Sequence, residues 1–157
     1  MVVHVQREDF DLGQALESLT RDNHGIGGLA SFVGLVRDLH PGHDASAVRS
    51  MTLEHYPGMT ERQLEAIEAE ARARWPLDAT LIIHRYGRLE PGDRIVLVAC
   101  ASAHRDAAFA ACQFLMDWLK TKAPFWKLEE TESGQHWVAA KDSDDHAAER
   151  WNSGQSP

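Results

Sequence analysis

The chain has 157 residues, 43% of them hydrophobic and 25% charged, which is the composition of an ordinary soluble globular protein with one buried core. Its net charge is −8, from 24 acidic and 16 basic side chains, which argues against a protein that binds nucleic acid through a basic face. No apolar run approaches the roughly 20 residues of a membrane span, and residues 1–7 lack the apolar core of a signal peptide.

The chain contains two cysteines, Cys100 in a predicted strand and Cys112 in a predicted helix. Free cysteines are commonly buried, so we interpret both as buried, reduced thiols. Reduced thiols are typical of the cytoplasm, and we expect the protein in that compartment.

Short strands and a first helix are predicted at the N-terminus. Residues 2–7 have the pattern of a strand, and residues 11–21 carry leucine and alanine at helical spacing. After a glycine-rich turn, residues 29–38 are rich in β-branched and aromatic side chains, and residues 47–56 alternate between apolar and polar ones. Both segments are predicted as strands.

A second helix is predicted to follow them. Thr60, with Gln63 three residues later, predicts a capping box at its start. The helix is expected to run to about Arg74, because Pro76 stops it.

The second half of the chain predicts strands, a long helix, a hairpin and a last helix. The predicted strands are residues 80–86, 94–101, 125–130 and 136–139, and the predicted helices are residues 105–121 and 142–151. The long helix has one apolar face, and Pro124 forces its end.

Hairpin-length turns connect most of these strands. This arrangement predicts an α+β fold with a largely antiparallel sheet and two main helices. We expect residues 1–151 to form a single domain and residues 152–157 to be a disordered tail.

The nine histidines do not predict a metal site. His40 and His43 share one loop, without cysteines or paired carboxylates at ligand spacing, and no His-Glu-x-x-His motif occurs. The glycine-rich turn at residues 25–28 does not fit the dinucleotide-binding fingerprint. We interpret Ser102, two residues before His104, as a helix cap and not as a nucleophile.

Cationic side chains are found at both ends of the long predicted helix. His104 and Arg105 stand at its start, where backbone N–H groups and the helix dipole favour anions. Lys120 and Lys127 flank Pro124, so one can project from a helix end and the other from a strand toward a shared cleft. Taken singly, Lys120 would be a solvated lysine at a helix end. Together these residues predict an anion pocket, in which like charges could tune a lysine for acid–base work.

Three segments resemble the large, catalytic subunit of molybdopterin synthase. They are residues 52–60 (TLEHYPGMT), residues 102–105 (SAHR) and residues 114–127, which contain MDWLK and APFWK. The similarity extends from about Gly28 to Trp151. It implies an α/β hammerhead-type fold and a homodimer, in which each large subunit binds a small ubiquitin-like sulfur carrier to give a heterotetramer.

The resemblance also implies a reaction in the biosynthesis of the molybdenum cofactor. The carrier's C-terminal thiocarboxylate supplies the sulfur, so no metal or redox cofactor is expected. Two such sulfur atoms convert cyclic pyranopterin monophosphate into the dithiolene of molybdopterin. Arginine and histidine donors can hold the phosphate, and cationic donors suit the oxyanion of a tetrahedral acyl intermediate. Expelling oxygen leaving groups needs a proton source, which either lysine could provide.

The resemblance assigns roles residue by residue. Lys120 and Lys127 match the family's two active-site lysines. The residues that match its substrate contacts are Leu35, Val36, Arg37, His104, Arg105, Lys120, Lys127, Leu128 and Glu129. Two positions depart from some relatives. Leu35 replaces a lysine and removes an ionic role there, and Lys141 replaces an arginine that is implied to reach the neighbouring subunit's pocket. Lysine keeps the charge but loses the bidentate fork.

Two other interpretations compete with a synthase. A non-catalytic scaffold that binds a ubiquitin-like partner or an anionic metabolite would tolerate the loss of Lys120 and Lys127, and both are present. A thioesterase that uses His104 as a base would need a partner carboxylate and an apolar acyl tunnel, and the sequence shows neither.

Overall fold

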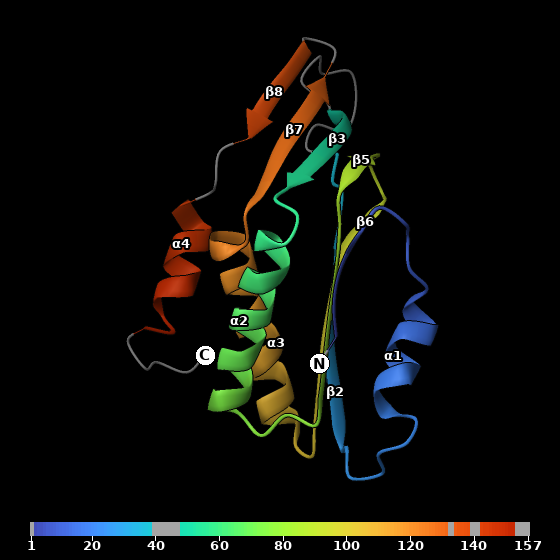
Figure 1. Ribbon diagram of the computed structural model, residues 1–157, viewed down its shortest axis with the longest axis vertical. Helices are drawn as coiled ribbons and strands as arrows, with labels where there is room; N and C mark the ends of the chain where they lie inside the picture. Colours follow the sequence, from blue (N-terminus) through green and yellow to red (C-terminus); the bar gives the residue numbers. More distant parts are fainter. Residues whose placement is uncertain (1, 39–47, 132–133, 139–141, 153–157) are drawn as a thin grey trace.

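The computed structural model describes residues 2–38, 48–131, 134–138 and 142–152. These described residues form two four-stranded sheets and four helices (Figure 1). The strands are β1 (Val2–Gln6), β2 (Gly28–Leu35), β3 (Val48–His55), β4 (Ala79–Arg85), β5 (Gly87–Leu89), β6 (Arg94–Ser102), β7 (Phe125–Thr131) and β8 (Gly134–Val138). The helices are α1 (Leu12–Thr20), α2 (Met59–Arg74), α3 (Arg105–Lys122) and α4 (Asp142–Glu149).

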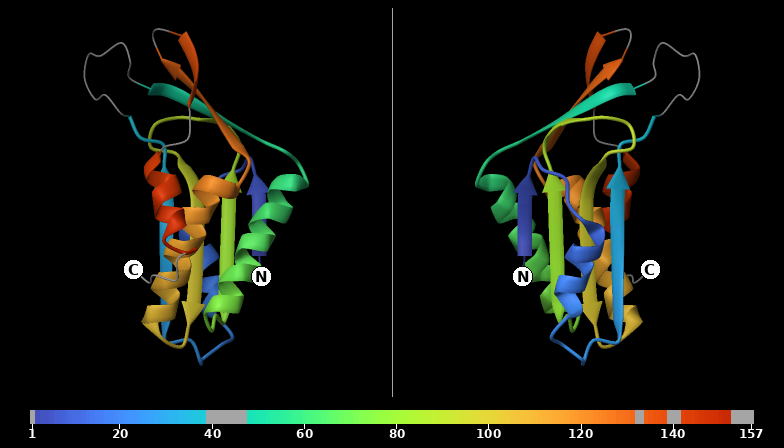
Figure 2. Two further views of the ribbon diagram at one scale, coloured as in Figure 1. Left: turned by 90° about the vertical axis from the view of Figure 1, so that its left-hand side faces the viewer. Right: turned by 90° about the vertical axis from the view of Figure 1, so that its right-hand side faces the viewer.

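The first sheet has the strand order β1-β4-β6-β2 and forms the centre of the fold. Strand β1 runs parallel to β4, and the other neighbouring strands are antiparallel. Helices α2 and α3 cover one face and α1 covers the other (Figures 1 and 2). Strand β6 contributes to both cores because its side chains alternate, so that Val98 packs with α3 while Leu97 packs with α1.

Both cysteines lie in the helix-covered core between α2, α3 and the sheet, as predicted. Their thiols are free, and burial raises the pKa of each, that of Cys112 to about 11. Thiols with raised pKa values remain protonated and unreactive near neutral pH.

The second sheet has the order β5-β3-β7-β8, with antiparallel neighbours, and extends beyond one end of the first sheet (Figure 1). Strand β4 of the first sheet is followed almost directly by β5 of the second. A small core of Val36, Met51, Leu53 and Leu89 lies at this junction. The antiparallel character predicted from the sequence is confirmed, although the strands form two sheets and not one.

The start of α2 differs from the prediction. The N-cap is Gly58, with φ +81°, and its N–H donates to a Glu61 carboxylate oxygen at 2.6 Å. Thr60 is buried inside the helix. Its hydroxyl accepts from the Tyr56 N–H at 3.1 Å and donates to the Pro124 carbonyl at 3.4 Å. The predicted pairing of Thr60 with Gln63 is therefore wrong, because Thr60 binds the segment between α3 and β7 instead.

None of the described helices is long and apolar enough to cross a bilayer. The described residues also contain no group of three or more histidine, cysteine or carboxylate side chains placed to hold a metal ion. His40 and His43 lie outside the described residues.

Candidate active site

Helix α3 places the predicted cationic residues at two separate locations. His104 is its N-cap, with an extended backbone, and Arg105 is its first residue. Lys120 lies in its last turn. At 1.5 Å rise per residue, Arg105 and Lys120 are separated by about 22 Å along the helix. One copy of the chain therefore does not bring these two residues to a common pocket.

The N-terminal end of α3 packs tightly against the start of β2. The Gly27 N–H donates to the Ser102 carbonyl at 3.0 Å, and a Cβ atom on Gly27 would lie 2.2 Å from the Ala103 carbonyl oxygen. Ser102 is not the N-cap that the sequence indicated, because the N-cap is His104. The Ser102 hydroxyl accepts from the His104 N–H at 3.5 Å and donates to the Pro76 carbonyl at 2.7 Å. The Arg105 side chain is 84% exposed, which leaves its guanidinium accessible.

The C-terminal end of α3 leads directly into β7 (Figure 1). Lys120 lies in the last turn of α3 and Lys127 is the third residue of β7. Lys120 is exposed, and Lys127 is partly buried. Side chains alternate along a strand, so Lys127 shares a face of β7 with Phe125. The predicted convergence of a helix-end lysine and a strand lysine across Pro124 is consistent with this path of the chain.

Both lysines act electrostatically on a buried histidine, His84. Burial, and after it repulsion from Lys127, His55 and Lys120, lowers the pKa of His84 to about 4, although the hydrogen bond to the Arg85 carbonyl raises it. Groups from α3, β3 and β7 therefore act on one side chain at the end of β4. His84 was not among the residues predicted from the sequence. His84 lies on the same face of the predicted strand as Thr80 and Ile82, and this period-two pattern indicates that its side chain points into the core.

The end of β2 carries three of the predicted substrate contacts. Leu35 is 54% exposed, Val36 is buried and Arg37 is exposed. The Val36 N–H donates to the Asp93 carbonyl at 2.9 Å, and the Val36 carbonyl accepts from the Gly92 N–H at 2.8 Å. The backbone of Val36 is thus already bonded to the turn before β6, which leaves the Arg37 side chain as the group here best able to bind an anion.

Leu128 and Glu129 lie in the middle of the second sheet. Leu128 pairs with Thr52 of β3 and with Trp137 of β8. Because β7 has a neighbour on each side, its backbone is engaged in the sheet ladders. Glu129 lies on the same face of β7 as Lys127. Lys141 lies outside the described residues.

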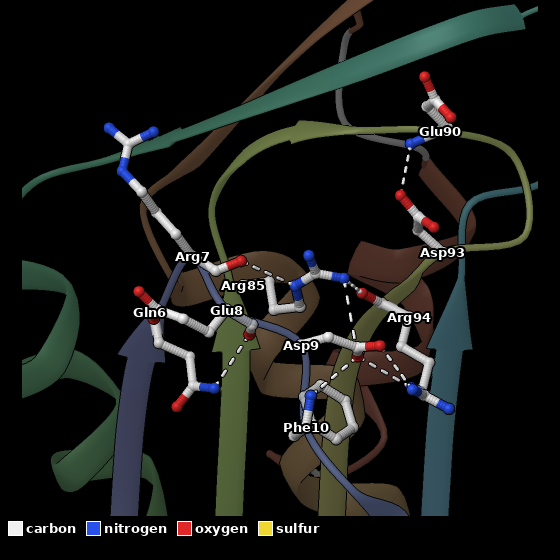
Figure 3. A network of polar contacts seen from close by, with 9 residues as sticks. All are labelled: Gln6, Arg7, Glu8, Asp9, Phe10, Arg85, Glu90, Asp93 and Arg94. Atoms are coloured by element: carbon white, nitrogen blue, oxygen red, sulfur yellow. Dashed lines mark hydrogen bonds and ion pairs between the residues drawn. The ribbon is translucent and has the colours of Figure 1, made fainter.

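An ion-pair network fixes the end of β4 next to His84 (Figure 3). The Arg94 guanidinium donates to both Asp9 carboxylate oxygens, at 2.9 and 2.5 Å, and these hydrogen bonds hold the pKa of Asp9 down to about 2. Arg85 donates to the Arg7 carbonyl and to the Arg94 carbonyl, each at 3.0 Å. Strand β4 is thereby tied to the segment after β1 and to the start of β6.

A cavity of about 480 Å³ lies beside this network. Its lining includes Leu12, Val33, Leu35, Asp9, Asp93 and Arg94. The charged residues of its lining are the carboxylates of Asp9 and Asp93 and the guanidinium of Arg94, which already binds Asp9, so the lining carries a net negative charge. This cavity is therefore a poorer candidate for an anion site than the lysine cluster formed by Lys120 and Lys127.

Comparison with known proteins identifies the family. Residues 5–122 match the family described as MoaE protein. The molybdopterin synthase catalytic subunit of Pseudomonas aeruginosa is 56% identical over 151 residues, which are 96% of this chain and 99% of that protein. The chain belongs to the MoaE protein family.

Solved structures of MoaE proteins share the fold. A molybdopterin biosynthesis MoaE protein from Burkholderia ambifaria is 51% identical, with a TM-score of 0.81, and the match covers 96% of this chain and 97% of that one. A molybdopterin synthase from Staphylococcus aureus is 30% identical, with a TM-score of 0.78, over 87% of this chain and 96% of that one. The resemblance found in the sequence and the predicted fold class are both confirmed. The roles assigned to individual residues remain predictions.

Proposed function

We propose that this chain is the catalytic subunit of a molybdopterin synthase. In this proposal it transfers sulfur from the C-terminal thiocarboxylate of a small ubiquitin-like carrier to cyclic pyranopterin monophosphate and forms the dithiolene of molybdopterin. The observation that carries the proposal is the path of the chain from α3 through Pro124 into β7, which places Lys120 in the last turn of the helix and Lys127 in the strand that follows, in a chain of the MoaE protein family.

The lysine cluster suits the chemistry of this reaction. The thiocarboxylate sulfur attacks a carbon of the pterin and displaces an oxygen substituent, which gives a thioester between the carrier and the pterin. Water then adds to the thioester carbonyl, and the tetrahedral intermediate, which carries an oxyanion, collapses to release the carrier as a carboxylate and to leave the sulfur on the pterin. Two ammonium groups fixed at the end of α3 and the start of β7 can stabilise that charge. An ammonium group is also a proton donor, so one of the pair can protonate an oxygen leaving group. Because the carrier supplies the sulfur, the proposed reaction requires no redox cofactor.

The separation along α3 supports a homodimer. If Arg105 and His104 bind the same pterin as Lys120, they must come from a second copy, because about 22 Å of helix separates them within one chain. The surface near the start of α3 is suited to such a contact. Phe109 on α3 is 65% exposed and Phe32 on β2 is 44% exposed. Exposed aromatic side chains of this kind are enriched at protein interfaces. With one carrier per subunit, the assembly would be a heterotetramer.

The proposed compartment is the cytoplasm. Two buried, free cysteines with raised thiol pKa values are suited to a reducing environment.

Reconstitution tests the function. The purified chain is incubated with a thiocarboxylated small carrier and cyclic pyranopterin monophosphate, and molybdopterin is measured as its oxidised fluorescent derivative. We expect product in proportion to the thiocarboxylate added, with two sulfur atoms per product. The matched control is the same carrier with an ordinary C-terminal carboxylate, which should give none. If the chain binds the carrier but forms no molybdopterin, the scaffold interpretation replaces the synthase.

A further inference from the structure

His84 is a buried polar residue beneath the two lysines. It lies next to the end of β4 and is 5% exposed. Thr80, Ile82 and His84 alternate along β4, and Ile82 belongs to the core under α2 and α3. His84 therefore points toward the face of the first sheet that α2 and α3 cover, and Lys120 lies in the last turn of α3.

One ring nitrogen of His84 has a defined role. Nδ1 lies 2.8 Å from the Arg85 carbonyl oxygen, which can only accept a hydrogen bond. Nδ1 therefore carries the proton, and in the neutral ring Nε2 keeps its lone pair. The Arg85 side chain is itself held by the Arg7 and Arg94 carbonyls, so the partner of Nδ1 is fixed in place.

The His84 ring is stacked on Phe125. The two ring centroids are 3.6 Å apart and the planes are inclined by 15°. Phe125 is the first residue of β7, and Lys127 lies two residues further along on the same face. His55 of β3 pairs with Phe125 in the second sheet, and its ring centroid lies 6.4 Å from that of Phe125 and 4.2 Å from that of Tyr86. The stack thus joins the end of β4 to the strand that carries Lys127.

We propose that His84 is a positioning residue for sulfur transfer, whose neutral ring holds Phe125 and thereby sets the place of Lys127 beside Lys120. This inference rests on the proposed function. In this role His84 acts on Lys127 indirectly, through its contact with Phe125 at the start of β7.

Three requirements at this position explain why histidine suits it. The Arg85 carbonyl needs an N–H donor, Phe125 needs a flat ring, and the lysine pair must not gain a third positive charge. A neutral histidine meets all three. The low pKa of His84 follows from burial first and from Lys127, His55 and Lys120 second, so the ring stays uncharged at neutral pH. Phenylalanine would keep the ring but lose the donor, and leucine would lose both.

The test compares His84→Leu with His84→Phe and uses Thr80→Val as a matched control. Thr80 is buried in the same strand, and its hydroxyl donates to Glu68 at 2.5 Å, far from the lysine cluster. Single-turnover rate constants and half-saturation concentrations for the carrier and the pterin are measured well below each variant's Tm. We expect His84→Leu to reduce the rate constant at least tenfold and to change the half-saturation concentration for the pterin by less than threefold. His84→Phe should restore the rate constant to within threefold of wild type. Thr80→Val should lower Tm without changing the rate constant.

If His84→Leu does not fold, Phe125→Leu removes the other ring of the stack from a partly exposed position, and the same tenfold loss is expected. Unchanged rate constants in every folded variant that lacks the stack would overturn the inference, and so would a His84→Phe variant as slow as His84→Leu. A wild-type chain that forms no molybdopterin would refute the proposed function instead, because the inference concerns differences from an active wild type.

Discussion

Arg105 and Lys120 lie at opposite ends of helix α3, about 22 Å apart, although both are predicted to contact one small substrate. Both side chains are exposed, so neither is needed for the hydrophobic core. In a twofold dimer each active site would take its lysines from one copy and His104 with Arg105 from the other. The separation within one chain is thus the structural reason for expecting a shared site.

Complementation between two inactive variants tests this arrangement. Arg105→Ala and Lys120→Ala should each be nearly inactive as homodimers. When the two are unfolded and refolded together in equal amounts, half of the dimers are mixed and each mixed dimer has one intact site. Activity should therefore recover to about a quarter of wild type. The control is refolding of each variant alone. Absence of recovery, with mixed dimers demonstrated by mass spectrometry, would place Arg105 outside the site that contains Lys120.

Lys120 is expected to contribute to the chemical step. Lys120→Ala should lower the single-turnover rate constant at least about 100-fold, or about 2.7 kcal/mol of barrier, because a fixed cation next to the oxyanion is lost. Lys122→Ala is the matched control, since Lys122 is an exposed lysine in the same helical turn and its ammonium group lies 4.0 Å from the Trp118 ring. It should retain activity within threefold. A Lys120→Ala variant within threefold of wild type would show that the assigned role is wrong.

The elements with a strong local pattern were predictable from the sequence. Helix α3 was expected at residues 105–121 and spans Arg105–Lys122, because its apolar residues repeat at helical spacing and Pro124 ends it. Strand β5 was missed because it has only three residues and follows β4 after one residue. The cap of α2 was misassigned because Gly58 adopts a positive φ, which a pattern of side chains does not reveal.

The site was predictable only in part. The strand–helix and helix–strand junctions identified the cationic residues, because those positions are local features of the sequence. The role of His84 depends on a contact with Phe125, and these residues are far apart in the chain. Likewise, the engagement of the Val36 backbone by the Asp93 turn could not be inferred from either segment alone. Both the contact of His84 with Phe125 and the hydrogen bond of Val36 to Asp93 depend on packing between segments that are far apart in the chain.

Acid should destabilise the fold partly through His84. Its pKa is about 4 in the folded protein and near the ordinary 6.5 in the unfolded chain, so the unfolded state binds the additional proton first as the pH falls. The folded state is therefore stabilised at neutral pH, and this contribution, about 3 kcal/mol at most, is lost between about pH 6.5 and 4.

Urea unfolding at pH 7 and pH 4.5 measures this effect. His84→Phe cannot take up the proton, so its stability should fall by about 2 kcal/mol less than that of wild type over this interval. The exposed residue His24 provides the control, and His24→Gln should follow wild type. Equal losses for His84→Phe and wild type would show that His84 does not titrate in this way.

Lys127 is expected to receive the carrier's C-terminal tail. The chain is acidic overall, with a net charge of −8, so the lysine cluster is a local exception that can attract a thiocarboxylate. A glycine tail can enter a narrow site because it has no side chains, although ordering it costs about 1–2 kcal/mol per residue. Contacts with the terminal thiocarboxylate and with the globular body of the carrier must offset that cost. Reversing the charge in Lys127→Glu would replace attraction by repulsion at the end of the tail.

Titration calorimetry with the thiocarboxylated carrier should therefore show at least about tenfold weaker binding for Lys127→Glu, which corresponds to about 1.4 kcal/mol. Lys122→Glu makes the same change in net charge at the exposed end of α3 and should bind within threefold of wild type. Deleting the carrier's terminal glycine should weaken binding to wild type and have little further effect on Lys127→Glu, because both changes remove the same contact. Additive losses in the double change would place Lys127 away from the tail. Light scattering should in parallel find a dimer of the chain alone and a heterotetramer with two carriers, and a stable monomer that ignores the carrier at micromolar concentration would contradict the assembly.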